Sequence, residues 1–296
     1  MKRPVFGAAL FAAIFGLTAS FAGDAHSFSW PAKEWDKAKS IFTFSQNRKD
    51  RFCQSLVLRG VQTASATDKG KIIAVITEKQ GDGDWFESPL GNALIISHDD
   101  SLISVYGNLT PQSAAALSLK TCLEDEEALG QTGMSSWSES EEGGELEFQI
   151  ADAGSKTFIN PIILMPRNLK PPKIELDGIS IENQFGRAYN LAALRSAPAG
   201  VYKIYKKRQA DVNVYKSELY VNGAEIEKIS KETLKCQDGR LALAGKELYT
   251  SQEFYPAGDR EFLGHILLPH GSDTVTLVAS DIFDSASTLN FTVSGY

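Results

Sequence analysis

Short runs in which polar and apolar residues alternate are the feature that most limits the fold of this chain. Glu145-Leu146-Glu147-Phe148-Gln149-Ile150 alternates at every position, and successive side chains of a β-strand point to opposite faces of its sheet. Similar runs, separated by turns rich in Gly, Asn and Pro, recur along 41–168 and 173–296. The pattern predicts a mainly β protein built from antiparallel sheets.

The first residues have the composition of an export signal. Lys2 and Arg3 precede an apolar run from Val5 to Leu17, and Ser20-Phe21-Ala22 provides a small-x-small cleavage site. We therefore expect 1–22 to be a secretory signal peptide and the mature protein to be exported, to the periplasm or to the outer face of the cell envelope. No later segment reaches the roughly 20 apolar residues of a membrane-spanning helix, so no integral membrane segment is expected after signal removal.

The remainder divides at Pro171-Pro172, because two adjacent prolines stop a strand or helix and stiffen the connection. The expected parts are a lead segment at 23–40, a first domain at 41–168, a linker at 169–172 and a second domain at 173–296. Within the first domain, 110–127 is rich in Ala and Leu and predicts a helix inserted between strands.

The second domain contains about seven strand candidates at the spacing of a β-sandwich. They are 173–176, 201–206, 212–221, 224–229, 240–244, 274–280 and 288–293. Asn222-Gly223 separates two of them and predicts a two-residue hairpin turn. The closing runs, 273–281 and 287–293, resemble the last strand pair of bacterial immunoglobulin-like modules, so an immunoglobulin-like β-sandwich is expected here.

Four segments of the first domain follow one another in a fixed order: 58–75, the hairpin 90–109, the turn 129–135 and the strand 145–150. In order and spacing they resemble the LytM or lysostaphin-type zinc metallopeptidases, which cut peptide cross-bridges in peptidoglycan. The resemblance covers 41–166 and implies an antiparallel β domain of the LytM type, a duplicated hybrid motif. It also gives individual positions of this chain a counterpart in the family.

The family's metal-ligand positions correspond to Leu58, Gln62 and Glu147, and two further family histidines correspond to Asn108 and Glu145. A catalytic zinc needs about three protein ligands, whereas leucine has no lone pair and a neutral amide is a poor ligand for zinc. The resemblance therefore implies a degenerate domain with no catalytic residue, no metal site and no cofactor. The five positions become candidates for contact with a partner.

Glu145 and Glu147 are two residues apart on a predicted strand, so their side chains leave the same face. Three roles remain open for them. The two carboxylates hold a cation or a basic side chain of a partner, act as an acid–base pair on a glycan, or are solvated groups without a function.

Histidine and cysteine add little further chemistry. His98 matches a family position that is not a ligand, and a structural hydrogen bond is expected for it. Of the three cysteines, Cys53 and Cys122 fall in the same domain and are the expected disulfide pair, which leaves Cys236 over. Zinc binding by cysteine is not expected, because no Cys-x-x-Cys spacing is present.

The formal net charge of −7 disfavours nucleic acid as a partner. Two acidic runs, 124–127 and 139–142, are either solvated loops or a charged rim that attracts a basic partner. The expected function is that of an exported, non-catalytic pseudopeptidase of the bacterial cell envelope. It would bind a protein partner, such as a cell-wall hydrolase, or peptidoglycan. The alternative is an active cell-wall hydrolase, a metallo-endopeptidase or a carboxylate-based enzyme, with an unrecognised site.

Overall fold

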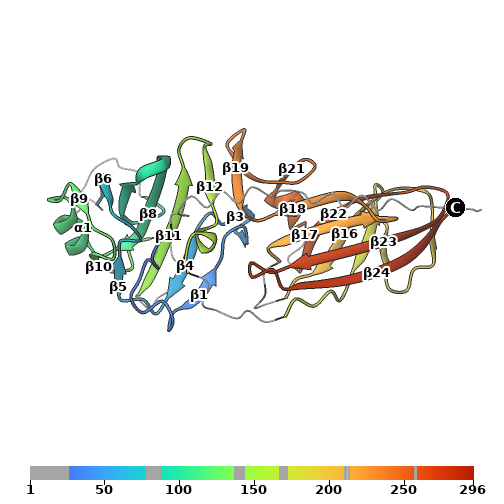
Figure 1. Ribbon diagram of the computed structural model, residues 1–296, viewed down its shortest axis with the longest axis horizontal. Coiled ribbons are helices and arrows are strands. Elements are labelled where there is room, and N and C mark those ends of the chain that lie inside the picture. Colours follow the sequence, from blue (N-terminus) through green and yellow to red (C-terminus); the bar gives the residue numbers. More distant parts are fainter. Residues whose placement is uncertain are drawn as a thin grey trace, which may run out of the picture.

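The computed structural model describes residues 27–77, 88–136, 144–166, 173–209, 212, 214–256 and 259–296. The chain is mainly β with antiparallel sheets, which confirms the predicted fold class. Two units follow each other along the long axis, and the C-terminus lies at the far end of the second unit (Figure 1). The signal peptide 1–22, the acidic run 139–142 and the linker 169–172 lie outside the described residues.

The elements of the first unit are β1 (Lys39–Phe42), β2 (Asn47–Arg48), β3 (Arg51–Phe52), β4 (Leu56–Arg59), β5 (Thr63–Ser65), β6 (Gly70–Ile76), β7 (Asn92–Ser97), η1 (Asp99–Ser101), β8 (Leu102–Leu109), α1 (Pro111–Leu117), β9 (Cys122–Leu123), β10 (Ala128–Gln131), β11 (Glu145–Asp152), β12 (Thr157–Ile159) and η2 (Pro161–Ile163). Helix α1 forms inside the predicted insertion, and the Thr110 side chain accepts a hydrogen bond from the backbone N–H of Ser113 at its start. Within the described part of the chain, no helix is both long and apolar enough to cross a membrane.

The elements of the second unit are β13 (Ser180–Asn183), β14 (Ala188–Asn190), β15 (Ser196–Ala197), β16 (Gly200–Lys207), β17 (Lys216–Val221), β18 (Ala224–Ser230), β19 (Thr233–Gln237), β20 (Arg240–Ala244), β21 (Leu248–Thr250), α2 (Ser251–Phe254), β22 (Arg260–Leu268), β23 (Gly271–Ser280) and β24 (Ala286–Gly295). As predicted, Asn222 and Gly223 join β17 to β18, both with positive φ angles. The expected strand 173–176 is not a strand; Ile174 packs instead against Val214 and Ala279.

Strand β11 is central to the first unit. It pairs antiparallel with β4 on one side and with β8 on the other, and the sheet continues from β8 through β7 and β6 to β9. Leu146, Phe148 and Ile150 are fully buried in the first core, together with residues of β7 and β8. Each such burial contributes about 1.5–3 kcal/mol to folding. The alternation in the sequence therefore fixes which face of β11 turns inward.

The second unit is a β-sandwich. A four-stranded sheet, β14-β13-β16-β22, and a five-stranded sheet, β15-β24-β23-β17-β18, share one hydrophobic core. Ile204 and Leu263 enter this core from the first of these sheets, and Leu219 and Val275 enter it from the second. All strand pairs within the sandwich are antiparallel except β15 with β24.

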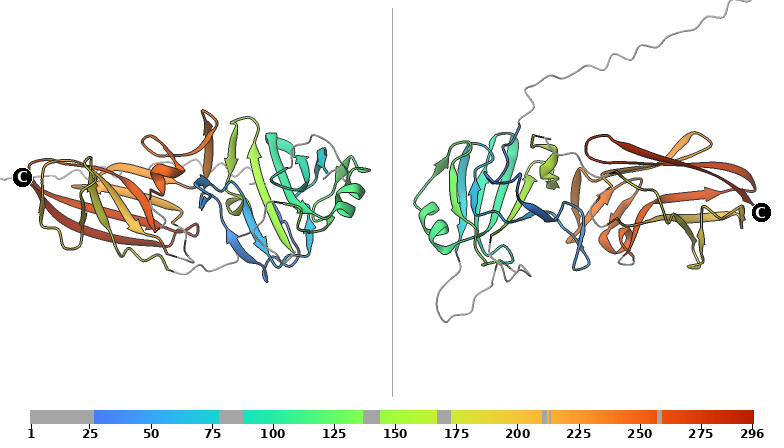
Figure 2. Two further views of the ribbon diagram at one scale, coloured as in Figure 1. Left: turned by 180° about the vertical axis from the view of Figure 1, so that it is seen from behind. Right: turned by 90° about the horizontal axis from the view of Figure 1, so that it is seen from below.

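The two units share a sheet. Strand β19 of the second unit pairs antiparallel with β12 of the first, so β19, β20 and β21 extend the sheet of the first unit (Figures 1 and 2). The run 240–244, predicted as a strand of the sandwich, is a strand of this shared sheet instead. Reading strands by periodicity finds such a run but does not show which sheet it joins.

A third hydrophobic core lies under the junction. Phe44 and Phe52 of the first unit pack there with Leu234, Phe254 and Tyr255 of the second. The Tyr255 hydroxyl donates to the backbone oxygen of Ser45 at 3.0 Å. Because a continuous sheet and a continuous core cross the junction, the second unit is held in a fixed orientation on the first.

A buried ion pair belongs to the same junction. Lys231 Nζ donates to Glu261 Oε1 at 2.6 Å, and the two side chains are 5% and 6% exposed. Burial lowers the pKa of Lys231, but the Glu261 carboxylate and the Tyr255 hydroxyl outweigh it, so the pKa is raised. Lys206 is also buried, and burial lowers its pKa even though Glu261 opposes that shift. Glu261 is therefore the paired anion of Lys231, and together with Asp177 it favours the charged form of Lys206.

Replacing this carboxylate should destabilise the junction. Glu261→Gln leaves the buried Lys231 without its anion, and we expect the free energy of unfolding to fall by about 3–5 kcal/mol in urea denaturation followed by circular dichroism. Glu218→Gln is the matched control, since Glu218 pairs at 3.5 Å with the partly exposed Lys216 and Lys228; its effect should stay below about 1 kcal/mol. Equal effects of the two substitutions would contradict a compensating role for Glu261.

Candidate functional site

The register of β11 decides which predicted positions come together. Glu145 lies opposite Arg59, and Leu146 lies opposite Leu58. Directly opposite residues of antiparallel strands share a face of the sheet. Leu58 is therefore in the core with Leu146, on the face opposite to Glu145 and Glu147. The structure does not bring this position together with the two carboxylates.

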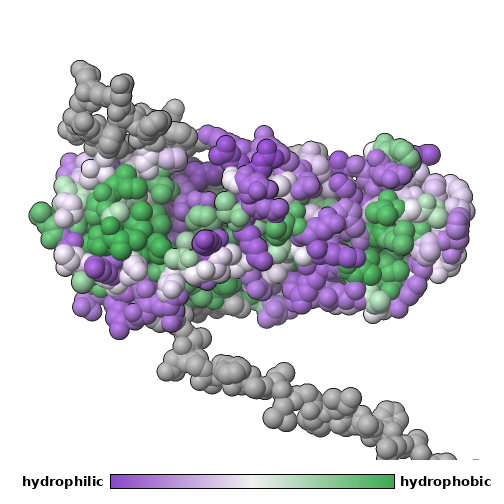
Figure 3. Space-filling model, turned by 90° about the horizontal axis from the view of Figure 1, so that it is seen from above, coloured by the Kyte–Doolittle hydropathy of each residue, from purple (hydrophilic) through white to green (hydrophobic). Residues whose placement is uncertain are grey.

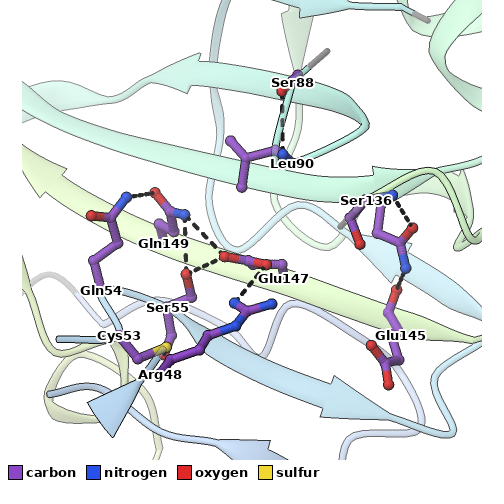
Figure 4. Close-up of polar contacts among 11 residues, drawn as sticks. Arg48, Cys53, Gln54, Ser55, Ser88, Leu90, Ser136, Glu145, Glu147 and Gln149 are labelled. Atoms are coloured by element: carbon purple, nitrogen blue, oxygen red, sulfur yellow. Dashed lines mark hydrogen bonds and ion pairs between the residues drawn. The ribbon is translucent and has the colours of Figure 1, made fainter. Parts of the chain in front are cut away.

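Glu147 is the centre of a hydrogen-bonded network. Arg48 Nη1 donates to its Oε2 at 3.0 Å, and Ser55 Oγ donates to its Oε1 at 2.6 Å (Figure 4). Gln149 Nε2 donates to Ser55 Oγ at 3.0 Å, and Gln54 Nε2 donates to Gln149 Oε1 at 3.1 Å. Glu147 itself is 8% exposed. We call these five residues the Glu147 network.

Glu145 lies apart from that network, two residues earlier on the same strand (Figure 4). Arg59 donates to its Oε1 from Nε at 2.8 Å and from Nη2 at 2.7 Å. Glu145 is only 3% exposed. The structure therefore contradicts the interpretation of Glu145 and Glu147 as solvated groups: both carboxylates are buried and paired with arginines of the same chain.

Asn108 links two turns to β11. Its Nδ2 donates to the backbone oxygens of Glu145, at 2.8 Å, and Gly133, at 2.9 Å. The backbone N–H of Ser136 donates to its Oδ1 at 3.0 Å. Asn108 has a φ angle of 66°, in the left-handed region that asparagine tolerates better than most residues. Its amide is thus a structural link rather than a free group.

Gln62 is exposed on the loop after β4, and its backbone oxygen accepts a hydrogen bond from Thr132 N at 3.0 Å. Of the five predicted positions, Asn108 contacts the backbone of Glu145, Glu147 lies two residues further along β11 in a separate network, and Leu58 and Gln62 lie apart from these three. Among the residues that the structure describes, no group of three or more His, Cys, Asp or Glu side chains lies close enough to hold a metal ion.

Cys53 and Arg48 complete the surroundings of Glu147. Burial raises the pKa of the Cys53 thiol, which donates to the backbone oxygen of Ser55 at 3.4 Å. Burial lowers the pKa of Arg48, but the Glu147 carboxylate outweighs it and the pKa is raised. The thiol is therefore neutral and the guanidinium charged near pH 7, so Cys53 is poorly suited to act as a nucleophile.

The expected Cys53–Cys122 disulfide is wrong, because all three cysteines are free. Cys53 is buried next to β4, whereas Cys122 is exposed on β9, and β11, β8, β7 and β6 lie between these two strands. The structural hydrogen bond expected for His98 is present. Its Nδ1 contacts the backbone oxygen of Lys69 at 2.8 Å, and its Nε2 contacts Ser104 Oγ at 2.7 Å.

The face of the sheet that carries the Glu147 network continues as an apolar surface. Gln149 lies opposite Val105, Val105 opposite Ile95, and Ile95 opposite Ala74. The residues of this apolar sheet face are Ala74, Ile76, Ile95, Ile103 and Val105, none of which belongs to the first core. Val105 is buried, whereas the other four are partly or fully exposed. Ile73, at an irregularity in β6, is 51% exposed beside them. Figure 3 shows hydrophobic residues gathered on the surface of the first unit.

Sequence reasoning missed the arginines and Ser55. Gln149 follows from the alternation, since 145, 147 and 149 must share a face. Arg48 and Arg59 reach their carboxylates across 99 and 86 residues of chain. No local pattern shows such pairs, although two carboxylates on one face of a predicted strand do indicate that compensating cations are needed.

Comparison with known proteins shows that the chain is similar to several solved structures. No curated protein matches the chain. One protein-family model matches residues 173–295. Among solved structures, the chain is similar to a chain of the SpoIIQ–SpoIIIAH pore-forming complex, with 15% identity and a TM-score of 0.37 over 48% of this chain and 93% of that chain. It is also similar to the catalytic domain of the prophage-encoded M23 protein EnpA from Enterococcus faecalis, with 16% identity and a TM-score of 0.33 over 47% and 96%.

The Arg48–Glu147 pair should be strongly coupled. We expect a double-mutant cycle of Arg48→Met and Glu147→Gln to give an interaction energy of about 1–3 kcal/mol in urea denaturation, because Glu147 is buried and Arg48 is only partly exposed. Lys120 and Glu127 form a more exposed pair, in which the side chains are 44% and 29% exposed. The same cycle on this pair should give less than about 1 kcal/mol. An interaction energy near zero for Arg48 and Glu147 would show that the pair does not hold the carboxylate.

Proposed function

We propose that this protein is a non-catalytic pseudopeptidase of the bacterial cell envelope, with a degenerate LytM-type domain followed by an immunoglobulin-like module, and that it binds a protein partner through the first unit. The observation that carries the proposal is the pairing of Glu145 with Arg59 and of Glu147 with Arg48. The LytM-type peptidases hold metal and move protons at these positions. Here the positions carry carboxylates that are already bound by arginine side chains of the same chain.

The chemistry of the five positions supports a binding role. A general base must be within reach of a substrate proton, but Glu147 is buried and its carboxylate is held by Arg48 and Ser55. Asn108 uses its amide for backbone contacts. Leu58 offers no lone pair and lies in the core. An acid–base pair of Glu145 and Glu147 on a glycan would first have to break both arginine contacts.

The neighbouring surface favours a protein as the partner. The apolar sheet face presents aliphatic side chains, and such surfaces bind the apolar side chains of another protein. Exposed residues of the acidic run 124–127 belong to the same unit and favour a partner with basic residues. The continuous sheet at the junction would let the second unit act as a fixed extension of the binding domain. The predicted signal peptide supports a place in the envelope.

The non-catalytic part of the proposal is tested with the purified mature protein. We expect no stoichiometric zinc by metal analysis and no release of fragments from purified peptidoglycan, with or without added zinc. An active LytM-type endopeptidase treated in the same way serves as the control. Stoichiometric zinc together with cleavage would contradict the proposal and favour an active cell-wall hydrolase.

The binding part is tested by photo-crosslinking in cells. A crosslinking residue at Ile73, beside the apolar sheet face, should capture a protein that the same residue at Phe185 on the second unit does not. With the captured partner purified, Ile95→Lys and Ile103→Lys should each weaken binding about tenfold or more, because a charge would then face the partner's apolar surface.

Leu119→Lys is the matched control for these substitutions, since Leu119 is 87% exposed at the end of α1. It should bind the partner as the native protein does, and all variants should keep the native circular dichroism spectrum. Unchanged binding by the Ile95 and Ile103 variants would overturn the assignment of the surface. Retention on isolated sacculi with no protein captured would point to peptidoglycan instead.

A further inference from the structure

A cleft of about 750 Å³ lies at the junction of the two units. Its wall consists of the β2–β3 hairpin with the loop that follows, the β19–β20 hairpin, Phe158 of β12, and the residues where β21 meets α2. This size lies within the range of small-ligand sites, and a boundary between two packed units is a frequent place for them. The cleft therefore has the dimensions of a binding site for a small molecule or short peptide.

Two tight turns shape the edges of this junction cleft. Lys49 and Asp50 have φ angles of 52° and 60°, and Asp238 and Gly239 have φ angles of 50° and 74°. Positive φ at both central residues is the geometry of two-residue hairpin turns that match the twist of their strands. Both turns belong to paired hairpins, so the charged residues at the cleft edges stand on ordered backbone.

Cations exceed anions along the wall, although the whole chain is acidic. Arg51, Arg240 and Lys49 line the cleft with Asp50 and Asp238. The side chains of Arg51 and Arg240 are exposed, and they make no hydrogen bond or ion pair with any residue that the structure describes. Guanidinium groups bind carboxylates with two parallel hydrogen bonds. The two aspartates offer complementary sites for an amino group.

The remaining wall suits a peptide. Phe52, Phe158 and Leu241 give it an apolar part. Gln54 lines the cleft while its amide is held by Gln149 of the Glu147 network, so its position is fixed before any ligand arrives. Ser251 also belongs to the wall, and its buried hydroxyl has no hydrogen-bond partner in the described part of the chain. An unsatisfied buried hydroxyl is unusual in a folded protein.

We propose that the junction cleft binds a short peptide that carries more carboxylates than amino groups, a class that includes the stem peptides of peptidoglycan and the acidic tails of proteins. Arg51 and Arg240 bind the carboxylates, and the aspartates at the turns bind the amino group. Arg51 and Arg240 are the cations of the wall whose side chains have no partner among the described residues, so carboxylates should outnumber amino groups in the ligand. This site is separate from the apolar sheet face and does not depend on the function proposed for that surface.

Cys236 provides the readout, because it is exposed and lines the cleft. Cys122 is exposed on β9 at the far end of the shared sheet and serves as the internal control, while Cys53 is buried. The rates at which iodoacetamide alkylates Cys236 and Cys122 are measured in the mature protein by mass spectrometry. The probes are L-Ala-γ-D-Glu-meso-diaminopimelate, L-Ala-L-Glu-L-Ala and the uncharged-tail control L-Ala-L-Gln-L-Ala-amide.

A peptide with free carboxylates should slow alkylation of Cys236 by about tenfold when its concentration is ten times its Kd, because about nine tenths of the clefts are then filled. Alkylation of Cys122 should not change, and the amide should protect neither thiol. Protection by the diaminopimelate peptide alone would assign the ligand to peptidoglycan, and protection by the α-linked peptide alone would assign it to protein tails.

Arg51→Gln combined with Arg240→Gln should abolish the protection, whereas Arg195→Gln, an exposed arginine of the second unit, should preserve it. Cys53, which is buried in the native fold, should stay unreactive in each variant, and this shows that the fold is intact. The proposal is overturned if neither carboxylate peptide protects Cys236 at millimolar concentration, or if the double variant is protected as well as the native protein.

Discussion

The structure depends on the position of β11 between β4 and β8. Its apolar residues are buried on one face of the sheet. Because successive side chains of a strand point to opposite faces, Glu145, Glu147 and Gln149 lie on the other face. A carboxylate shielded from water is costly unless a cation and hydrogen-bond donors compensate it. Arg59, Arg48 and Ser55 meet that requirement. The chemistry of the site thus follows from the packing of one strand.

The same sheet also determines how the two units are arranged. Pairing of β12 with β19 carries the ladder from the first unit into the second, and the hairpin that follows forms one wall of the junction cleft. The buried pair of Lys231 and Glu261 stabilises this arrangement only as long as both partners are present. The Glu147 network reaches the cleft through Gln54, so the proposed peptide site and the Glu147 carboxylate are parts of one hydrogen-bonded region.

Periodicity in the sequence predicted what depends on local pattern. The strands around 145–150 and 90–109, the helix within 110–127 and the turn at Asn222-Gly223 all form. Apart from the expected strand 173–176, which does not form, the predictions that failed concern partners distant in the sequence. Neither the pairing of β19 with β12 nor the separation of Cys53 from Cys122 has a local signal, because each depends on the order of strands in a sheet. The face of Leu58 depends likewise on its register with Leu146.

The carboxylates of β11 are bound by the chain's own arginines, and we propose that they do not hold a metal. X-ray diffraction at the zinc absorption edge, from crystals grown with excess zinc, tests it most directly. The account predicts no anomalous peak within bonding distance of Glu145 or Glu147 and intact contacts from Arg59 and Arg48. A zinc ion bound to Glu147, with Arg48 displaced, would contradict it.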